Sequence, residues 1–132
     1  IGLHKAYNSE HIYTFLEQNN CYHTFFEDYI KNPDGFYEDL NIICDRAKNK
    51  ILGLDIDMDS IAFMPSSAFT PSGFQLEQVR YLVQKIGSLK ETKYLHLTEG
   101  AANDEPEKKT IGKTLAYLCW DFISQKQNAL SN

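Results

Sequence analysis

The stretch ILGLDIDMDS, from Ile51 to Ser60, decides how the fold is read. Its first half is an apolar run, which is typical of a buried β-strand. Acids follow at every second position, namely Asp55, Asp57 and Asp59. A buried strand does not normally end in three acids unless charge is needed there. The acids therefore hold a metal ion, act as a nucleophile, or only terminate the strand.

The segments on either side of this strand predict alternating strands and helices. Apolar residues at helical spacing indicate the helices, and proline, glycine and serine indicate the loops. The expected elements are, in chain order, a strand at 1–5, a helix at 10–20, a short extended stretch at 21–26, a turn at 32–35, a helix at 36–50, the strand at 51–57, a loop at 64–73, a helix at 74–89, a strand at 93–98, a loop at 99–109 and a closing helix at 110–126. Such alternation implies parallel strands with right-handed crossovers. We therefore expect an α/β fold with three αβα layers and a mostly parallel sheet.

Length and composition limit the classes of protein. With 132 residues, the chain is one domain or part of one, spanning 1–132. Its net charge of −5 argues against nucleic acid as the main partner, and no apolar run reaches the roughly 18 residues of a membrane span. The chain opens at Ile1 rather than Met, so we expect a segment of a longer protein. Cys21, Cys44 and Cys119 lack C-x-x-C spacing and predict buried thiols in a reducing, cytoplasmic compartment.

Two of the expected strands end in acids. Binding sites in an α/β fold form beyond the carboxyl ends of the parallel strands, and these ends carry Asp55 with Asp57, and Glu99. Side chains two apart on a strand share a face, so Asp55 and Asp57 converge with their Cα atoms roughly 6.6 Å apart. A carboxylate pair of this kind repels unless it is protonated or neutralised by a cation. Its oxygen atoms suit Mg, Mn or Ca ions.

Two known D-x-D patterns compete for this pair. A calcium-binding EF-hand loop that starts at Asp55 would need Gly at its sixth position and Glu at its twelfth. The sequence has Ser60 and Ser66 there, so that hypothesis fails. A haloacid-dehalogenase-type phosphatase also begins with an apolar strand and D-x-D, but usually continues with Gly-Thr, whereas Met58 and Asp59 follow here. The phosphatase stays an alternative on the local pattern alone.

The longer pattern resembles the C-terminal half of the arginase/ureohydrolase family. That family has a strand of the form S-F-D-x-D-x-x-D-P, a loop ending in T-P-x-G-G, a helix, and a strand ending in E-x-N-P. This chain has GLDIDMDSIAFMPSSAFTPSGF at 53–74, then a predicted helix, then YLHLTEG at 94–100. The matching positions are Asp55 and Asp57 for the paired metal ligands, Thr70, Pro71 and Gly73 for the loop, and Glu99 for the substrate-binding carboxylate.

The resemblance implies the C-terminal portion of a binuclear manganese hydrolase. Such an enzyme cleaves a C–N bond of a linear amidine or guanidine, as formimidoylglutamase, arginase and agmatinase do. Two Mn²⁺ ions would share a hydroxide of lowered pKa, with Asp55 bridging both ions and Asp57 completing one of them. Glu99 would orient the cationic nitrogens of a small-molecule substrate, while Thr70 and Ser72 would line the pocket mouth. The pattern is most similar to the formimidoylglutamase-like branch, and the full-length protein is expected to be a homo-oligomer.

Several positions depart from the family pattern. The loop has one Gly where the family commonly has two, Asp59-Ser60 replace its usual continuation, and Gly100-Ala101 replace x-Asn-Pro. The sequence also has no D-x-H-x-D strand, which supplies the family's other metal ligands. We therefore expect the segment alone to be inactive. Two classes of function stay open: an enzyme that is seen here by its C-terminal portion, and a non-catalytic ureohydrolase-like domain for assembly or ligand binding.

Structural roles are predicted for the other side chains that could carry chemistry. Asp59 is expected to cap a turn, His96 to be a core or interface histidine, and His23 to pack among aromatic residues. The charged run at 103–109 is expected to be a solvated loop. The closing helix carries three aromatic residues that are expected in the core, namely Tyr117, Trp120 and Phe122.

Overall fold

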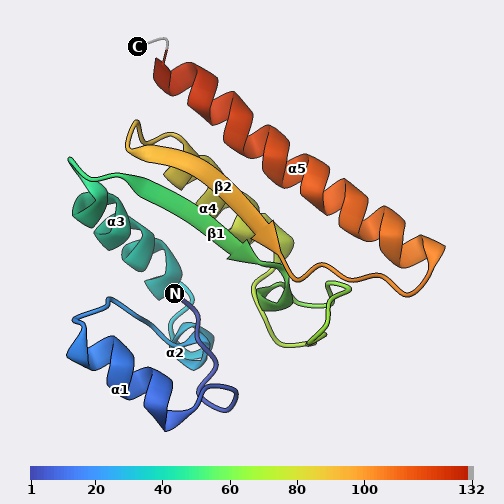
Figure 1. Cartoon of the computed structure of the whole chain (residues 1–132), viewed down its shortest axis with the longest axis horizontal. Helices are drawn as coiled ribbons and strands as arrows, with labels where there is room; N and C mark the ends of the chain where they lie inside the picture. Colours follow the sequence, from blue (N-terminus) through green and yellow to red (C-terminus); the bar gives the residue numbers. More distant parts are fainter. Residues whose placement is uncertain (131–132) are drawn as a thin grey trace. The chain divides into compact units, whose positions relative to one another are not determined.

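The computed structural model describes residues 1–130, and Figure 1 shows the course of the chain. The chain divides into two compact units, the first from Ile1 to Ile43 and the second from Cys44 onward. The parallel strands and the predicted site belong to the second unit. The expectation that 1–132 form one domain, or part of one, stays a prediction.

A pair of parallel strands lies in the second unit (Figure 1). β1 spans Leu52–Asp57 and β2 spans Thr92–Thr98. Their register sets Asp57 opposite Thr98, so both carboxyl ends lie at the same edge of the sheet. The predicted α/β fold with parallel strands is confirmed.

Helix α4 (Leu76–Gly87) joins the two strands and forms a layer on one side of them. Figure 1 shows this helix running behind β1 and β2. Side chains alternate across a strand, and Ile56 of β1 is buried between two exposed acids. The buried side chains of α4 follow helical spacing, as the sequence predicts: Val79, Leu82, Val83 and Ile86.

Helix α5 (Glu105–Leu130) begins inside the charged run that predicts a loop. The carboxylate of Asp104 accepts a hydrogen bond from the backbone N–H of Glu107 at 2.8 Å, and such a bond caps a helix. Acids in the first turn also stabilise the helix, because they lie near the positive end of its dipole. The expectation of a solvated loop as far as residue 109 is therefore wrong. Neither α5 nor any other helix within residues 1–130 is long and apolar enough to cross a membrane.

One face of α5 is buried and the opposite face is exposed. The buried residues are Thr114, Leu118 and Asp121. Tyr117 lies at the edge of this face and Trp120 lies farther round the helix, and 47% and 69% of their surfaces are exposed. Their predicted place in the core is wrong, because helical periodicity turns these positions away from the buried stripe. Phe122, which follows Asp121, is half-buried.

A bidentate ion pair joins α4 to α5. Arg80 donates from Nε to Oδ2 of Asp121 at 2.7 Å and from Nη2 to Oδ1 at 3.1 Å. Gln84 donates a third hydrogen bond to Asp121 at 2.8 Å, and the guanidinium lies 4.7 Å from the ring centre of Tyr117. Burial alone would raise the pKa of Asp121, but the bonds from Arg80 and Gln84 hold that pKa below its usual range. The buried carboxylate is thus fully paired.

The first unit contains three helices: α1 (Glu10–Gln18), α2 (Phe26–Lys31) and α3 (Gly35–Ala47), of which α3 continues into the second unit. α1 and α3 match the predicted helices, whereas the sequence pattern predicts no helix at the position of α2. At six residues it is too short for apolar periodicity to reveal it.

The expectation of a strand at 1–5 is wrong. Only Leu3 pairs, as an isolated bridge with Phe25. Its N–H donates to Thr24 O at 2.9 Å, and its carbonyl accepts from Phe26 N at 3.0 Å. The chain turns directly afterwards, where Tyr7 N donates to the carbonyl of His4 at 3.2 Å, so the extended stretch cannot continue.

The three thiols are free rather than disulfide-bonded. Cys21 and Cys119 are exposed, so their predicted burial is wrong. Cys44 is half-buried, and this burial raises the pKa of its thiol.

Candidate functional site

Asp55 and Asp57 lie on the same exposed face of β1, as the alternation of a strand requires. Each carboxylate has a partner within the chain. Asp55 Oδ1 lies 2.7 Å from Nδ1 of His96 on β2, and Asp57 Oδ1 accepts a hydrogen bond from the backbone N–H of Asp59 at 3.0 Å. The second bond starts the 3-10 turn η1 (Met58–Ser60). Asp59 thus lies in a turn, as expected.

His96 is exposed and hydrogen-bonded, so the expectation of a core position is wrong, while the alternative of an interface position stays a prediction. The parallel register sets it directly opposite Asp55, and 61% and 62% of the two side chains are exposed. A carboxylate oxygen can only accept a hydrogen bond, so Nδ1 of His96 carries the proton in this contact. The sequence could not reveal this pair, because it depends on the register between two strands that lie far apart in the chain.

Glu99 follows β2 immediately and lies at the same end of the sheet as Asp57. Its backbone has a φ of 65°, in the left-handed region that costs energy for a residue other than glycine. Its Oε2 accepts a hydrogen bond from the hydroxyl of Ser67 at 3.0 Å. The structure thus brings the three predicted acids to one end of the strands, with Glu99 tied to the loop that precedes α4.

That loop, residues 61–75, is the β1–α4 loop, and it is fastened to both strand ends. Ser66 bridges to Gly100, and Ala101 N donates to the carbonyl of Pro65 at 3.2 Å. On the β1 side, Ala68 N donates to Asp59 Oδ1 at 3.4 Å. These contacts hold the loop against the acids, and the sequence motif alone did not identify the residues that make them.

Thr70 and Ser72, which were predicted to line a pocket mouth, bond to each other. The hydroxyl of Thr70 donates to Ser72 O and accepts from Ser72 N, both at 3.1 Å. Thr70 is buried and Ser72 is exposed. The hydroxyl of Thr70 therefore shapes the loop in this structure, which leaves Ser72 as the more accessible of the two side chains.

Ser66 is a polar residue of this loop that sequence reasoning missed. Its hydroxyl oxygen is buried and, within the described part of the chain, has no hydrogen-bond partner. A buried polar group without a partner costs about 1–3 kcal/mol.

The donor atoms at this end of the sheet have the right chemistry for a hard cation but are too few for a binuclear centre. Asp55 and Asp57 offer carboxylate oxygens, and His96 offers its Nε2 nitrogen while Nδ1 is bonded to Asp55. Within residues 1–130, no group of three or more His, Cys, Asp or Glu side chains could hold a metal ion. By themselves, these residues do not fit a two-ion site.

The chain has an arginase-like α/β fold. Formimidoylglutamase from Bacillus subtilis has a similar structure with a TM-score of 0.76 and 14% sequence identity, over 98% of this chain and 41% of that protein. Entamoeba histolytica arginase in complex with L-ornithine is similar with a TM-score of 0.63 and 20% identity, over 78% of this chain and 36% of that protein. The chain thus spans about two-fifths of the length of these proteins.

No protein-family model matches the chain, and no curated protein matches it. The likeness is therefore one of fold. The arginase-like fold that the motif resemblance implies is thereby confirmed.

Proposed function

We propose that this chain is the C-terminal portion of a ureohydrolase that cleaves a C–N bond of a linear amidine or guanidine. The observation that carries the proposal is that Asp55 and Asp57 lie towards the carboxyl end of β1 and Glu99 follows β2 at the same edge of the sheet, in a chain of arginase-like fold. The proposed activity is of the formimidoylglutamase, arginase or agmatinase type, with the sequence pattern favouring formimidoylglutamase. The intact enzyme would be cytoplasmic and homo-oligomeric.

The proposed roles follow from the chemistry of the side chains. Asp55 and Asp57 would contribute carboxylate oxygens to a centre of two Mn²⁺ ions, whose other ligands come from polypeptide outside these 132 residues. When bound, such ions lower the pKa of a water molecule and polarise the substrate. Glu99 would orient the substrate by charge-assisted hydrogen bonds to its cationic nitrogens. Ser72 would lie at the pocket mouth, with Thr70 supporting it.

Binding of substrate and metal would replace two hydrogen bonds that the acids make within the chain. Glu99 would exchange its bond from Ser67 for bonds from the substrate, and Asp55 would exchange His96 for a cation. Both carboxylates are exposed, so these exchanges need no rearrangement of the core.

A second candidate is a non-catalytic ureohydrolase-like domain that serves in assembly or ligand binding. It is favoured by the lack of a group of three metal-binding side chains within the described residues. The haloacid-dehalogenase-type phosphatase rests on the D-x-D pattern only. The likeness of the fold to two ureohydrolases argues for the first proposal over the phosphatase.

The test compares variants in the full-length protein, by elemental analysis of bound manganese beside the rate of hydrolysis. Asp55→Ala should remove most of the metal and lower turnover by more than about 100-fold. Glu99→Ala should keep the metal and lower turnover by about 100- to 1,000-fold. Asp59→Ala is the matched control and should change little, because its carboxylate only accepts a 3.4 Å bond from Ala68.

The outcomes separate the two candidates. Full metal content and full activity in Asp55→Ala would show that the acids only end a strand, and the enzyme proposal would fail. An intact protein that binds no manganese and hydrolyses none of arginine, agmatine and formiminoglutamate would support the non-catalytic domain.

A further inference from the structure

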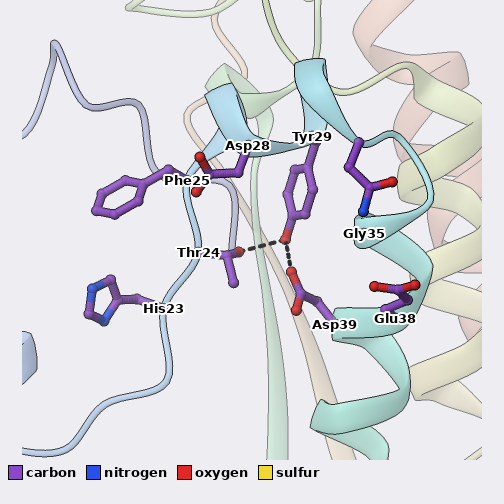
Figure 2. A pocket seen from close by; sticks show the side chains of 9 residues that line it. His23, Thr24, Phe25, Asp28, Tyr29, Gly35, Glu38 and Asp39 are labelled. Atoms are coloured by element: carbon purple, nitrogen blue, oxygen red, sulfur yellow. Dashed lines mark hydrogen bonds between the residues drawn. The ribbon is translucent and has the colours of Figure 1, made fainter.

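The first unit contains a cavity of about 360 Å³ that is separate from the acids of the sheet. This volume lies within the range of small-molecule sites, which is about 300–1,000 Å³. Figure 2 shows His23 and Phe25 on one side of it and Tyr29, Glu38 and Asp39 on the other. Its lining residues are His23, Thr24, Phe25, Asp28, Tyr29, Asn32, Gly35, Glu38 and Asp39. The lining thus combines aromatic rings with carboxylates and includes neither lysine nor arginine.

The charges around the cavity leave one carboxylate without a counter-charge. Asp28 pairs with Lys5 Nζ at 3.3 Å. Asp39 interacts with the α-amino group of Ile1, whose pKa is lowered by burial and raised by that carboxylate. Glu38 is exposed, and its carboxylate has neither a hydrogen bond nor an ion pair within the described residues. Glu38 is therefore a carboxylate of the lining for which the described residues supply no cation.

Two tyrosines donate hydrogen bonds to the carboxylate of Asp39. The hydroxyl of Tyr29 donates to Asp39 Oδ2 at 2.6 Å, and the hydroxyl of Tyr22 donates to Oδ1. Burial, together with the bond to Asp39, raises the pKa of Tyr29, so this phenol stays protonated at neutral pH. Thr24 lies 2.5 Å from the same hydroxyl. The back wall of the cavity is therefore a fixed polar network rather than a set of free side chains.

Lys5 already makes the kind of contact that we expect for a cation in this cavity. Lys5 Nζ lies 4.7 Å from the ring centre of Phe25 while it pairs with Asp28. An ammonium group between an aromatic face and a carboxylate gains both cation–π and charge-assisted stabilisation. Tyr29 and Glu38 offer a second ring and a second carboxylate inside the cavity, and no cation of the described chain is paired with Glu38.

We propose that this cavity binds a small organic monocation, an ammonium or amidinium ion with an apolar body. The charged head would lie beside Glu38, and the aromatic residues of the lining, Phe25 and Tyr29, would contact the apolar body. The site belongs to the first unit, so it does not depend on the function proposed for the acids of the sheet. A bare metal ion is disfavoured, because within residues 1–130 no group of three or more His, Cys, Asp or Glu side chains is placed to hold one.

The test is a titration of the isotope-labelled 132-residue chain with benzylammonium chloride, followed by NMR. Benzyl alcohol is the neutral probe of the same shape. Benzylammonium should shift the amide signals of residues 23–39 in a saturable way, and benzyl alcohol should not. Glu38→Gln should weaken benzylammonium binding by at least about threefold, which is modest because Glu38 is exposed. Phe25→Leu should also weaken it, by removing the ring face.

Glu10→Gln is the matched control, because this exposed acid of α1 does not line the cavity. Equal binding of the two probes would overturn the proposal. It would also be overturned if the Glu38→Gln and Glu10→Gln variants bound benzylammonium equally well. Saturable shifts of the same signals with MnCl2 but not with benzylammonium would also overturn it, and would make the cavity a metal site.

Discussion

At Gly73 the backbone of the β1–α4 loop lies against the turn after β1. A Cβ atom there would lie 2.5 Å from the carbonyl oxygen of Ser60 and 2.9 Å from the backbone nitrogen of Ala62. Phe74 N donates to the same carbonyl at 2.8 Å, which fixes the approach. The glycine of the T-P-x-G motif is therefore required by contact between two backbones, which cannot move aside as a flexible side chain can.

We expect Gly73→Ala to lower the free energy of unfolding by about 1–3 kcal/mol, the usual cost of forcing extra atoms into a packed site. Gly112→Ala is the matched control, because no atom lies within 4 Å of its added Cβ. In the interior of α5 this change should stabilise the chain by up to about 1 kcal/mol. Urea denaturation of both variants gives the two values. Equal effects would mean that the close approach at Gly73 does not constrain the loop.

Thiol reactivity should follow the exposure of the three cysteines. Cys21 and Cys119 should react quickly with a thiol reagent at neutral pH, because both are exposed. Cys44 should react more slowly, because burial raises the pKa of its thiol and so lowers the thiolate fraction. Reaction kinetics with Ellman's reagent, compared with the Cys44→Ser variant, would identify the slow phase. A single fast phase for all three thiols would contradict this expectation.

Among the contacts between elements, the pairing of α4 with α5 through Arg80 and Asp121 has the clearest energetic consequence. Asp121→Asn should lower the free energy of unfolding by about 2 kcal/mol at pH 7, less than for a fully buried pair because Arg80 is one-third exposed. The pKa of Asp121 is lower in the folded chain, so this stabilisation is present above the unfolded pKa of about 4 and is lost as the pH falls through the folded value.

Denaturation of wild type and Asp121→Asn at pH 7 and at pH 3 or below tests this dependence. The difference between them should shrink at the lower pH. Asp45→Asn serves as the control, because Asp45 pairs with Lys48 on the surface and should contribute little. A difference between wild type and Asp121→Asn that is independent of pH would show that the ionised pair is not the source of the stability.

The elements that the sequence predicted best are those whose pattern is local. The alternation within LGLDID placed Asp55 and Asp57 on one face, and the spacing of Val79, Leu82 and Val83 gave α4 its buried side. The failures depend on distant partners or on length. Trp120 looked like a core residue because composition does not say which face of a long helix meets α4. Helix α2 was missed because six residues carry too little periodicity.

The candidate site could be predicted as a set of residues but not as a set of contacts. The order of the motifs brought Asp55, Asp57 and Glu99 to one end of the sheet. The contact of His96 with Asp55 requires the strand register, and the bond from Ser67 to Glu99 requires the path of a loop. Neither is encoded in spacing along the chain. The start of α5 could have been found, because Asp104 followed by Glu-Pro-Glu is a recognisable cap.

For the molecule as a whole, we expect the 132-residue chain alone to hydrolyse neither arginine, agmatine nor formiminoglutamate. Within residues 1–130 no three metal-binding side chains come together, so manganese should bind weakly. The rate of product release with added manganese should equal that of the Asp55→Ala variant of the same chain. Hydrolysis above that background would show that two carboxylates suffice, and would remove the need for further ligands.

A sheet of two strands has two open edges. No third strand pairs with β1 or β2 in the part of the chain that the structure describes. Each strand therefore keeps one row of backbone N–H and C=O groups outside any ladder, which is the surface on which strands of separate molecules join. Preparations of these residues alone are expected to self-associate as their concentration rises. Sedimentation velocity at several concentrations should therefore precede any titration, because edge-to-edge assembly would otherwise be mistaken for ligand binding.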